Sequence, residues 1–151
     1  MTQEDKELLL KDLSARLPYH VHLKVWLKDG TTEEGPLDLK HNYGDVLRDA
    51  FYYKKIIDIK PYLRPMSSMT EEEKEELLNL LFDKEAKYFY IDEEGFIDGK
   101  TSDLMKEGFN YPSFCPINIE LYTDFLLSHH FDYRGLIEKK LALEVPDGMY
   151  K

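Results

Sequence analysis

The sequence of 151 residues contains one cysteine, Cys115, and no long run of apolar residues. A single cysteine excludes an internal disulfide and any zinc site that is built from several cysteines. Its neighbours offer no adjacent base, so we interpret Cys115 as an inert side chain and not as a nucleophile. No apolar run approaches the roughly 18 residues that a membrane-spanning helix requires, and the N-terminus is acidic where a secretory signal is positively charged. These absences predict a cytoplasmic protein that does not contact a membrane.

Short motifs that mark catalytic or cofactor sites are also missing from the sequence. There is no glycine-rich phosphate loop, no nucleophile elbow and no zincin helix. The acidic turn around Gly95 and Gly99 departs from the alternating oxygen ligands of a calcium loop. We therefore expect no catalytic residue, no bound metal ion and no cofactor.

The charge is distributed unevenly along a chain that is rich enough in apolar residues to fold. Hydrophobic residues make up 42% and aromatic residues 13% of the sequence, which is too much for a disordered chain. Residues 1–65 contain 11 basic and 11 acidic residues, whereas residues 66–151 contain 9 basic and 19 acidic residues. An acidic field repels nucleic acid and attracts basic surfaces. We expect a protein partner with a basic surface and no direct binding of nucleic acid; the oligomeric state stays open.

Residues 1–65 have the pattern of one helix followed by several short strands. Thr2 and Asp5 have the spacing of a capping box, and leucines recur at helical spacing until Pro18 ends the helix. From residue 20 to residue 28, apolar and polar side chains alternate strictly, which is typical of a half-buried strand. The segments 36–39 and 54–63 favour further strands. We expect the helix to pack on a small antiparallel sheet or barrel.

Residues 66–151 are expected to form an acidic and mainly helical part. The capping box of Thr70 and Glu73 predicts a helix at about residues 71–82. Its apolar stripe consists of Leu77, Leu78 and Leu81. Aromatic runs around a glycine turn indicate a hairpin within residues 86–99. Periodicity predicts further helices at about residues 102–108, 119–130 and 133–141. The fold class is therefore α+β, with a first part at 1–65 and a second part at 66–151 that either stay separate or share one core.

The segment HHFDYRG contains the one grouping of residues that resembles a site. His129 and His130 lie at the expected end of one helix, where the helix dipole favours cations, and Asp132 lies at the N-cap position of the next. Adjacent helical residues diverge by about 100°, so the two histidines are poorly placed to hold one ion. We interpret the segment as a structural corner. A metal or acid–base site at His129, His130 and Asp132 is the weaker alternative.

A second pair of histidines lies on the expected strand at residues 20–28. His20 and His22 would project on the same face roughly 7 Å apart, but no nearby acid completes a metal site. We interpret this face as an exposed surface that bears Trp26.

Three segments carry a resemblance to known proteins: DKELLLKDLSARLPY, PYLRPMSSMTEEEKEEL and HHFDYRGLIEKKLALEVPDGMYK. They resemble a group of small acidic proteins of gut anaerobic bacteria and their mobile elements, for which no function is assigned. The resemblance implies no ligand and no catalytic residue. The relatives have a glycine at the position of Lys140, where a glycine would cap the final helix. Lys140 must therefore adopt the left-handed conformation or let the helix continue.

These observations favour a non-enzymatic protein-interaction module, because folding signals are strong and no catalytic groups converge. The candidate contact residues are Trp26, Glu72, Glu75 and Glu76, since tryptophan often anchors interfaces and the glutamates form an acidic helix face. One alternative is an acidic decoy of a nucleic-acid-binding protein. Another is a metal-dependent enzyme that uses the histidine segment. Direct DNA binding through Arg134, Lys139 and Lys140 is opposed by the acidic surroundings.

Overall fold

The computed structural model describes residues 1–37, 56–100 and 117–150, which form a mixed α+β fold in two compact units. Unit 1 consists of Met1–Arg64 together with Leu127–Lys151, and unit 2 consists of Pro65–Leu126. The first change between units falls after Arg64, whereas the sequence placed a division after residue 65. The chain then returns to unit 1 at Leu127, so the final residues pack with the first part and not with the acidic part.

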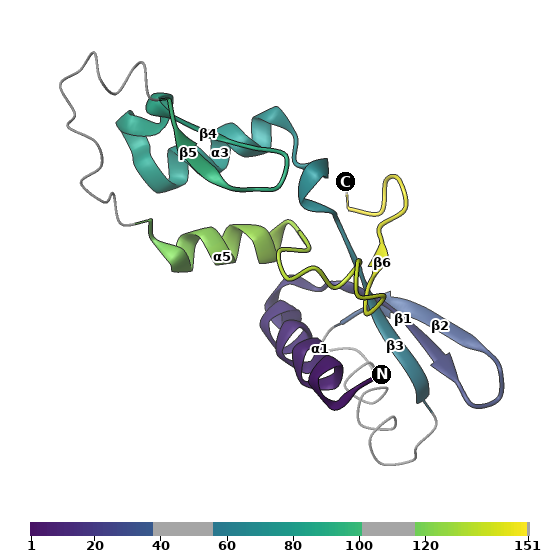
Figure 1. Ribbon diagram of the computed structural model, residues 1–151. Helices are drawn as coiled ribbons and strands as arrows, with labels where there is room; N and C mark the ends of the chain where they lie inside the picture. Colours follow the sequence, from purple (N-terminus) through teal and green to yellow (C-terminus); the bar gives the residue numbers. More distant parts are fainter. Residues whose placement is uncertain (38–55, 101–116, 151) are drawn as a thin grey trace. The chain divides into compact units, whose positions relative to one another are not determined.

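The sheet of unit 1 has the strand order β2-β1-β3-β6 (Figure 1). The central strand β1 (His22–Leu27) pairs antiparallel with β2 (Thr32–Pro36) and with β3 (Ile56–Leu63). The two-residue strand β6 (Leu143–Glu144) pairs with β3 in parallel. The expectation of a purely antiparallel sheet is wrong at this edge, because a long connection through unit 2 lets the chain return in the same direction as β3. Within the described residues no sheet closes into a barrel.

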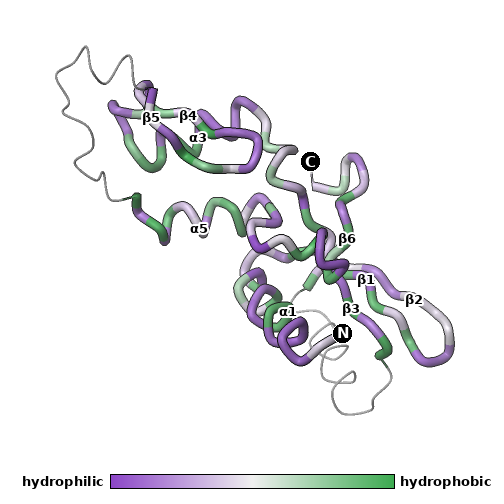
Figure 2. Tube along the Cα trace, in the orientation of Figure 1, coloured by the Kyte–Doolittle hydropathy of each residue, from purple (hydrophilic) through white to green (hydrophobic). Residues whose placement is uncertain are grey.

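The helix α1 (Gln3–Arg16) begins at the expected capping box, in which Asp5 N donates to Thr2 Oγ1 at 3.1 Å and Thr2 N donates to Asp5 Oδ2 at 2.9 Å. Figure 2 shows apolar and polar positions alternating along this helix. The core of unit 1 joins the helix, the sheet and the C-terminal segment, and its buried members include Leu9, Leu13, Val21, Leu23, Val25, Leu63, Leu136, Leu141 and Ala142. Residues from both ends of the chain thus share one core.

The helix expected at residues 133–141 is wrong. A single turn replaces it, in which Lys140 N donates to Ile137 O at 2.9 Å and Leu141 N donates to Leu136 O at 2.9 Å. This bonding pattern is that of a Schellman motif, and Lys140 occupies its left-handed position with φ 60°. Of the two conformations anticipated for Lys140, the left-handed one occurs. Gly135 is also left-handed, at φ 67°, so the helical conformation is interrupted on both sides of the turn.

Unit 2 combines a helix with a small hairpin. The helix α3 (Glu71–Phe82) has the expected capping box, since Glu73 N donates to Thr70 Oγ1 at 3.2 Å and Thr70 N donates to Glu73 Oε2 at 2.9 Å. The expected hairpin consists of β4 (Phe89–Ile91) and β5 (Ile97–Gly99). The hairpin lies against α3 (Figure 1). The rings of Phe82 and Phe89 stack with a centroid separation of 4.0 Å.

One further helix lies in the described residues after the hairpin. The helix α5 (Ile119–Ser128) corresponds to the expected helix at 119–130. Two predictions lie outside the described residues: the helix at 102–108 and the surroundings of Cys115. Among the residues that are described, no helix has both the length and the apolar character of a membrane span.

Candidate functional site

Asp132 organises the turn that follows α5. Its carboxylate accepts hydrogen bonds from Leu136 N at 2.8 Å and from Ile137 N at 2.7 Å. Phe131, which precedes it, is fully buried. Asp132 therefore accepts backbone hydrogen bonds at the corner, but its donors are Leu136 and Ile137, whereas an N-cap would accept from Arg134 or Gly135, and it holds a single turn and not a helix.

The same corner holds the end of β3. Arg64 N donates to His130 O at 2.9 Å, and Asp132 N donates to Arg64 O at 2.8 Å. These two bonds form a short parallel bridge between Arg64 and Phe131. The point at which the chain leaves unit 1 is therefore fixed beside the point at which it returns.

His130 is a buried, neutral side chain at the end of α5. Its backbone is left-handed, with φ 61°, and its ring stacks on Tyr150 with a centroid separation of 3.8 Å. Burial, together with the positive charge of Arg16, lowers the pKa of His130 to about 4. His129, by contrast, is partly exposed and lies beside Ser128, 3.2 Å from Nδ1 to Oγ. The two histidine rings therefore have different surroundings.

The Tyr150 hydroxyl connects two strands of the sheet. It accepts a hydrogen bond from His22 N at 2.8 Å and donates one to Tyr62 O at 3.0 Å, which links β1 to β3 where their pairing ends. Burial raises the pKa of Tyr150 to about 12, so the hydroxyl stays protonated and available as a donor. A side chain near the C-terminus thus extends the ladder between β1 and β3.

A buried ion pair joins α1 to the corner. Arg16 Nε lies 2.7 Å from Asp12 Oδ2, and both side chains are fully shielded from solvent. Arg16 Nη2 also donates to Phe131 O at 2.7 Å, and Arg134 Nε lies 3.8 Å from Asp12 Oδ1. This pair was not predicted from the sequence. Its signal was present, because Asp12 and Arg16 occupy helical positions that continue the apolar stripe of Leu9.

The chemistry of the corner is that of a structural network. His130 has its pKa lowered by burial and is stacked on an aromatic ring, and both carboxylate oxygens of Asp132 are engaged by backbone amides. Among the residues that the structure describes, no three His, Cys, Asp or Glu side chains are grouped so that they could hold a metal ion. His129, His130 and Asp132 are therefore not arranged to bind one metal ion together.

His20 and His22 do not lie on one strand face as expected. His20 is exposed and left-handed, with φ 54°, and caps the short helical turn that follows α1. The strand β1 begins only at His22. The physical reason is that α1 ends at Arg16 and a 3₁₀ turn, Leu17–Tyr19, follows it with Pro18 in its first positions; this turn ends at the left-handed His20.

Trp26 is a partly buried residue on the face of β1 that carries the polar side chains. The ammonium groups of Lys24 and Lys60 lie 5.7 Å and 5.8 Å from its ring centroid. Lys24 pairs with Glu34 at 2.6 Å, and this hydrogen bond raises the pKa of Lys24 and lowers the pKa of Glu34. Lys60 lies 3.6 Å from Asp58. Each of the two lysines beside Trp26 thus has a carboxylate nearby that offsets its positive charge.

The two units differ sharply in net charge. Unit 2, Pro65–Leu126, contains 5 basic and 15 acidic residues, whereas the rest of the chain contains 15 of each. The whole excess of −10 thus belongs to unit 2. On α3, Glu72, Glu75 and Glu76 are exposed as expected. The candidate contact residues are consequently divided, with Trp26 in unit 1 and the glutamates in unit 2.

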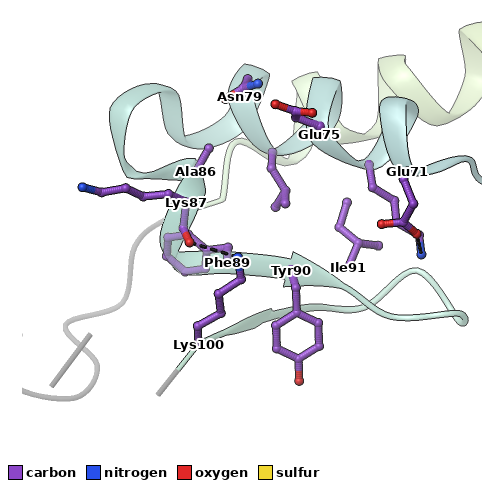
Figure 3. A pocket seen from close by; sticks show the side chains of 11 residues that line it. Glu71, Glu75, Asn79, Ala86, Lys87, Phe89, Tyr90, Ile91 and Lys100 are labelled. Carbon is purple, nitrogen blue, oxygen red and sulfur yellow. Dashed lines mark hydrogen bonds and ion pairs between the residues drawn. The ribbon is translucent and has the colours of Figure 1, made fainter. Parts of the chain in front are cut away.

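A hollow of about 410 Å³ lies between α3 and β4 (Figure 3). Its lining residues are Glu71, Lys74, Glu75, Leu78, Asn79, Ala86, Lys87, Phe89, Tyr90, Ile91 and Lys100. Leu78, Ala86 and Ile91 are buried and give it an apolar floor. Of the three candidate contact glutamates, Glu75 lines the hollow and Glu72 and Glu76 do not. The hollow could not be predicted from the sequence, because it depends on how the hairpin packs against the helix.

No protein-family model, curated protein or solved structure matches the chain. The function therefore has to be argued from the charge, the exposed surfaces and the hollow described above.

Proposed function

We propose that the protein is a non-enzymatic protein-interaction module whose acidic unit 2 binds a partner with a basic surface. The observation that supports this proposal is the separation of charge: unit 2 carries a net charge of −10 and the remainder is neutral. A surface field of one sign attracts a partner of the opposite sign, increases the rate of association and suppresses unsuitable partners.

The exposed face of α3 is the part of unit 2 that would meet the partner. Glu72, Glu75 and Glu76 are exposed and have no ion pair or hydrogen bond among the described residues. None of the described residues therefore neutralises their charges. Because exposed charges are screened within about 10 Å at 0.1 M salt, binding through this face would weaken as the salt concentration rises.

A pair of matched variants tests the proposal. The triple variant Glu72→Gln/Glu75→Gln/Glu76→Gln removes three exposed charges from α3. The control Glu4→Gln/Glu33→Gln/Glu138→Gln removes three exposed charges from unit 1, so both variants change the net charge equally. Tagged wild-type protein and both variants are used to capture proteins from native lysate, followed by quantitative mass spectrometry. We expect one partner at stoichiometric amounts with the wild type and the control, and strong depletion with the α3 variant. No stoichiometric partner, or equal depletion in both variants, would refute the proposal.

An acidic decoy of a nucleic-acid-binding protein is the second candidate, because the acidic field of unit 2 has the same sign as phosphate. The two candidates differ in how the captured complex responds to DNA. Displacement of the chain by double-stranded DNA at constant salt concentration would support the decoy. A complex that is insensitive to DNA would support an interaction module of another kind.

A further inference from the structure

We propose that the hollow between α3 and β4 binds an extended peptide segment of a partner protein, which pairs as a strand with the outer edge of β4 and places a lysine or arginine against Glu75. This inference rests on the proposed function and specifies the chemistry of the partner.

The backbone of β4 is suited to accept a further strand. Lys100 N donates to Tyr88 O at 2.7 Å and Asp92 N donates to Phe96 O at 3.0 Å, which fixes the alternation along the hairpin. In an antiparallel pair, every second residue directs its N–H and C=O to the neighbouring strand, and the residues between them direct these groups to the other edge. Ile91 therefore presents its N–H and C=O on the side of β4 that faces away from β5. Peptides are commonly recognised by adding a strand to such an edge.

The hollow lies along β4 and not along β5. All three residues of β4 line it, whereas no residue of Ile97–Gly99 does. Its volume of about 410 Å³ lies within the range of known binding clefts, about 300–1,000 Å³. Because side chains of a strand alternate between two faces, one apolar side chain of the peptide would contact the floor at Leu78 and Ile91 while its neighbours point outward.

The rim of the hollow carries charges of both signs, from two glutamates and three lysines. Lys74 Nζ lies 2.8 Å from Glu71 Oε1, so these two charges neutralise each other. The amine of Lys100 donates to Lys87 O at 3.1 Å, and the side chain of Lys87 extends away from the other lining residues (Figure 3). Glu75 has no such partner among the described residues. Glu75 is thus the carboxylate of the lining that is left for a basic residue of the ligand, and the net charge of −10 on unit 2 favours a basic ligand over an acidic one.

The same charge argues against the other occupants. A second copy of the chain would bring another unit 2 with a charge of −10 to the hollow, and the two fields would repel each other. Nucleic acid would be repelled for the same reason. A basic, extended protein segment satisfies both the open strand edge and the unneutralised Glu75.

The test uses the full chain and synthetic peptides of about seven residues in which lysine and valine alternate, long enough to pair with β4. A fluorescent version of this peptide is titrated by anisotropy, alongside a peptide with glutamate in place of lysine and one with N-methylated valines. We expect binding of the lysine peptide only, because N-methylation removes the donors that pair with the strand edge. The variant Glu75→Gln should weaken binding about threefold to fivefold, as expected for one exposed ion pair. The control Glu93→Gln, which is exposed in the turn between β4 and β5 and lies outside the lining of the hollow, should leave it unchanged.

Three results would overturn the inference. These are no binding of the lysine peptide up to about 1 mM, equal binding of the N-methylated peptide, or an equal effect of the two glutamate variants. Light scattering measures the oligomeric state in parallel. A dimer that forms in the wild type and is lost in Glu75→Gln would identify a second copy of the chain as the occupant, and this result would also overturn the inference. A lysate partner that the triple α3 variant loses and Glu75→Gln retains would leave the proposed function intact and remove only this inference. Peptide binding in the absence of any stoichiometric partner from the lysate would refute the proposed function and leave the peptide site at the hollow intact.

Discussion

Arg16 and Asp12, one helical turn apart in α1, form an ion pair from which solvent is fully excluded. Arg16 connects this pair to the corner after α5 through the carbonyl oxygen of Phe131, 115 residues away in the sequence. A buried pair of this kind adds little net stability by itself, because both charges are desolvated. The pair does determine which face of α1 contacts the corner, because Arg16 binds the carbonyl oxygen of Phe131 from that face.

The ion pair predicts a marked difference between single and double variants. Arg16→Met leaves the Asp12 carboxylate buried with only the more distant Arg134, and we expect it to lower the free energy of unfolding by about 4 kcal/mol. Asp12→Leu/Arg16→Met replaces both charges with apolar groups and should recover more than half of that loss. Chemical denaturation of both variants checks this prediction. A double variant that is less stable than Arg16→Met would contradict it.

His130 predicts a dependence of stability on pH. Its pKa in the folded protein is about 4, below the ordinary value of 6.5, so the unfolded chain takes up the proton first as the pH falls. The stabilisation is therefore complete above about pH 6.5, decreases between pH 6.5 and pH 4, and stays constant below that. We expect a loss of about 2 kcal/mol, less than the whole shift would give because the ring is not wholly shielded from solvent.

Two asparagine variants isolate this effect. His130→Asn and His20→Asn each replace a histidine in the left-handed conformation, which asparagine tolerates, but only His130 is buried. Between pH 6.5 and pH 5, where few carboxylates titrate, the slope of stability with pH should decrease in His130→Asn and stay unchanged in His20→Asn. Identical slopes in the wild type and His130→Asn would show that another group is responsible.

Asp132 predicts that the corner depends on hydrogen bonds and not on a metal ion. Asp132→Ala leaves the amides of Leu136 and Ile137 without their acceptor, and we expect it to lower the free energy of unfolding by about 2 kcal/mol. His129→Ala should cost less than about 1 kcal/mol, because its ring is partly exposed. Calorimetric titration with zinc should detect no binding at one equivalent. Tight zinc binding that either His129→Ala or His130→Asn abolishes would make a metal site the correct interpretation.

The hydrogen bond to Thr70 at the start of α3 should contribute measurably to the free energy of unfolding. Thr70→Ala removes the acceptor of the Glu73 amide and should lower the stability by about 1 kcal/mol. Thr70→Ser keeps the oxygen and serves as the control, with a change of only a few tenths of a kcal/mol. Urea denaturation measures both. An unchanged midpoint for Thr70→Ala would mean that other contacts hold this end of the helix.

Elements with a local signal could be predicted from the sequence. The capping box at Thr70 and the strict alternation in His22–Leu27 depend on residues within a few positions of one another, and both elements occur as expected. The face of α3 that carries Glu72 could be predicted for the same reason, since helical spacing separates exposed positions from buried ones.

Features that depend on distant contacts could not be predicted. The spacing of Tyr133 and Leu141 fits a helix, yet burial of Leu136 and the left-handed Lys140 allow only one turn. The hydroxyl of Tyr150 finds its partner 128 residues away, at His22, and nothing in the local sequence indicates it. The return of the chain to unit 1 is of the same kind, because periodicity describes each element and not which core it joins.

The bridge between Arg64 and Phe131 makes unit 2 an insertion whose two ends meet at one place in the host. A host that holds both ends by its own backbone bonds does not depend on what is inserted between them. Evolution could therefore lengthen, replace or delete the acidic insert while the surrounding sheet and helix persist. Proteins that share this scaffold would then diverge in what they recognise sooner than in how they fold.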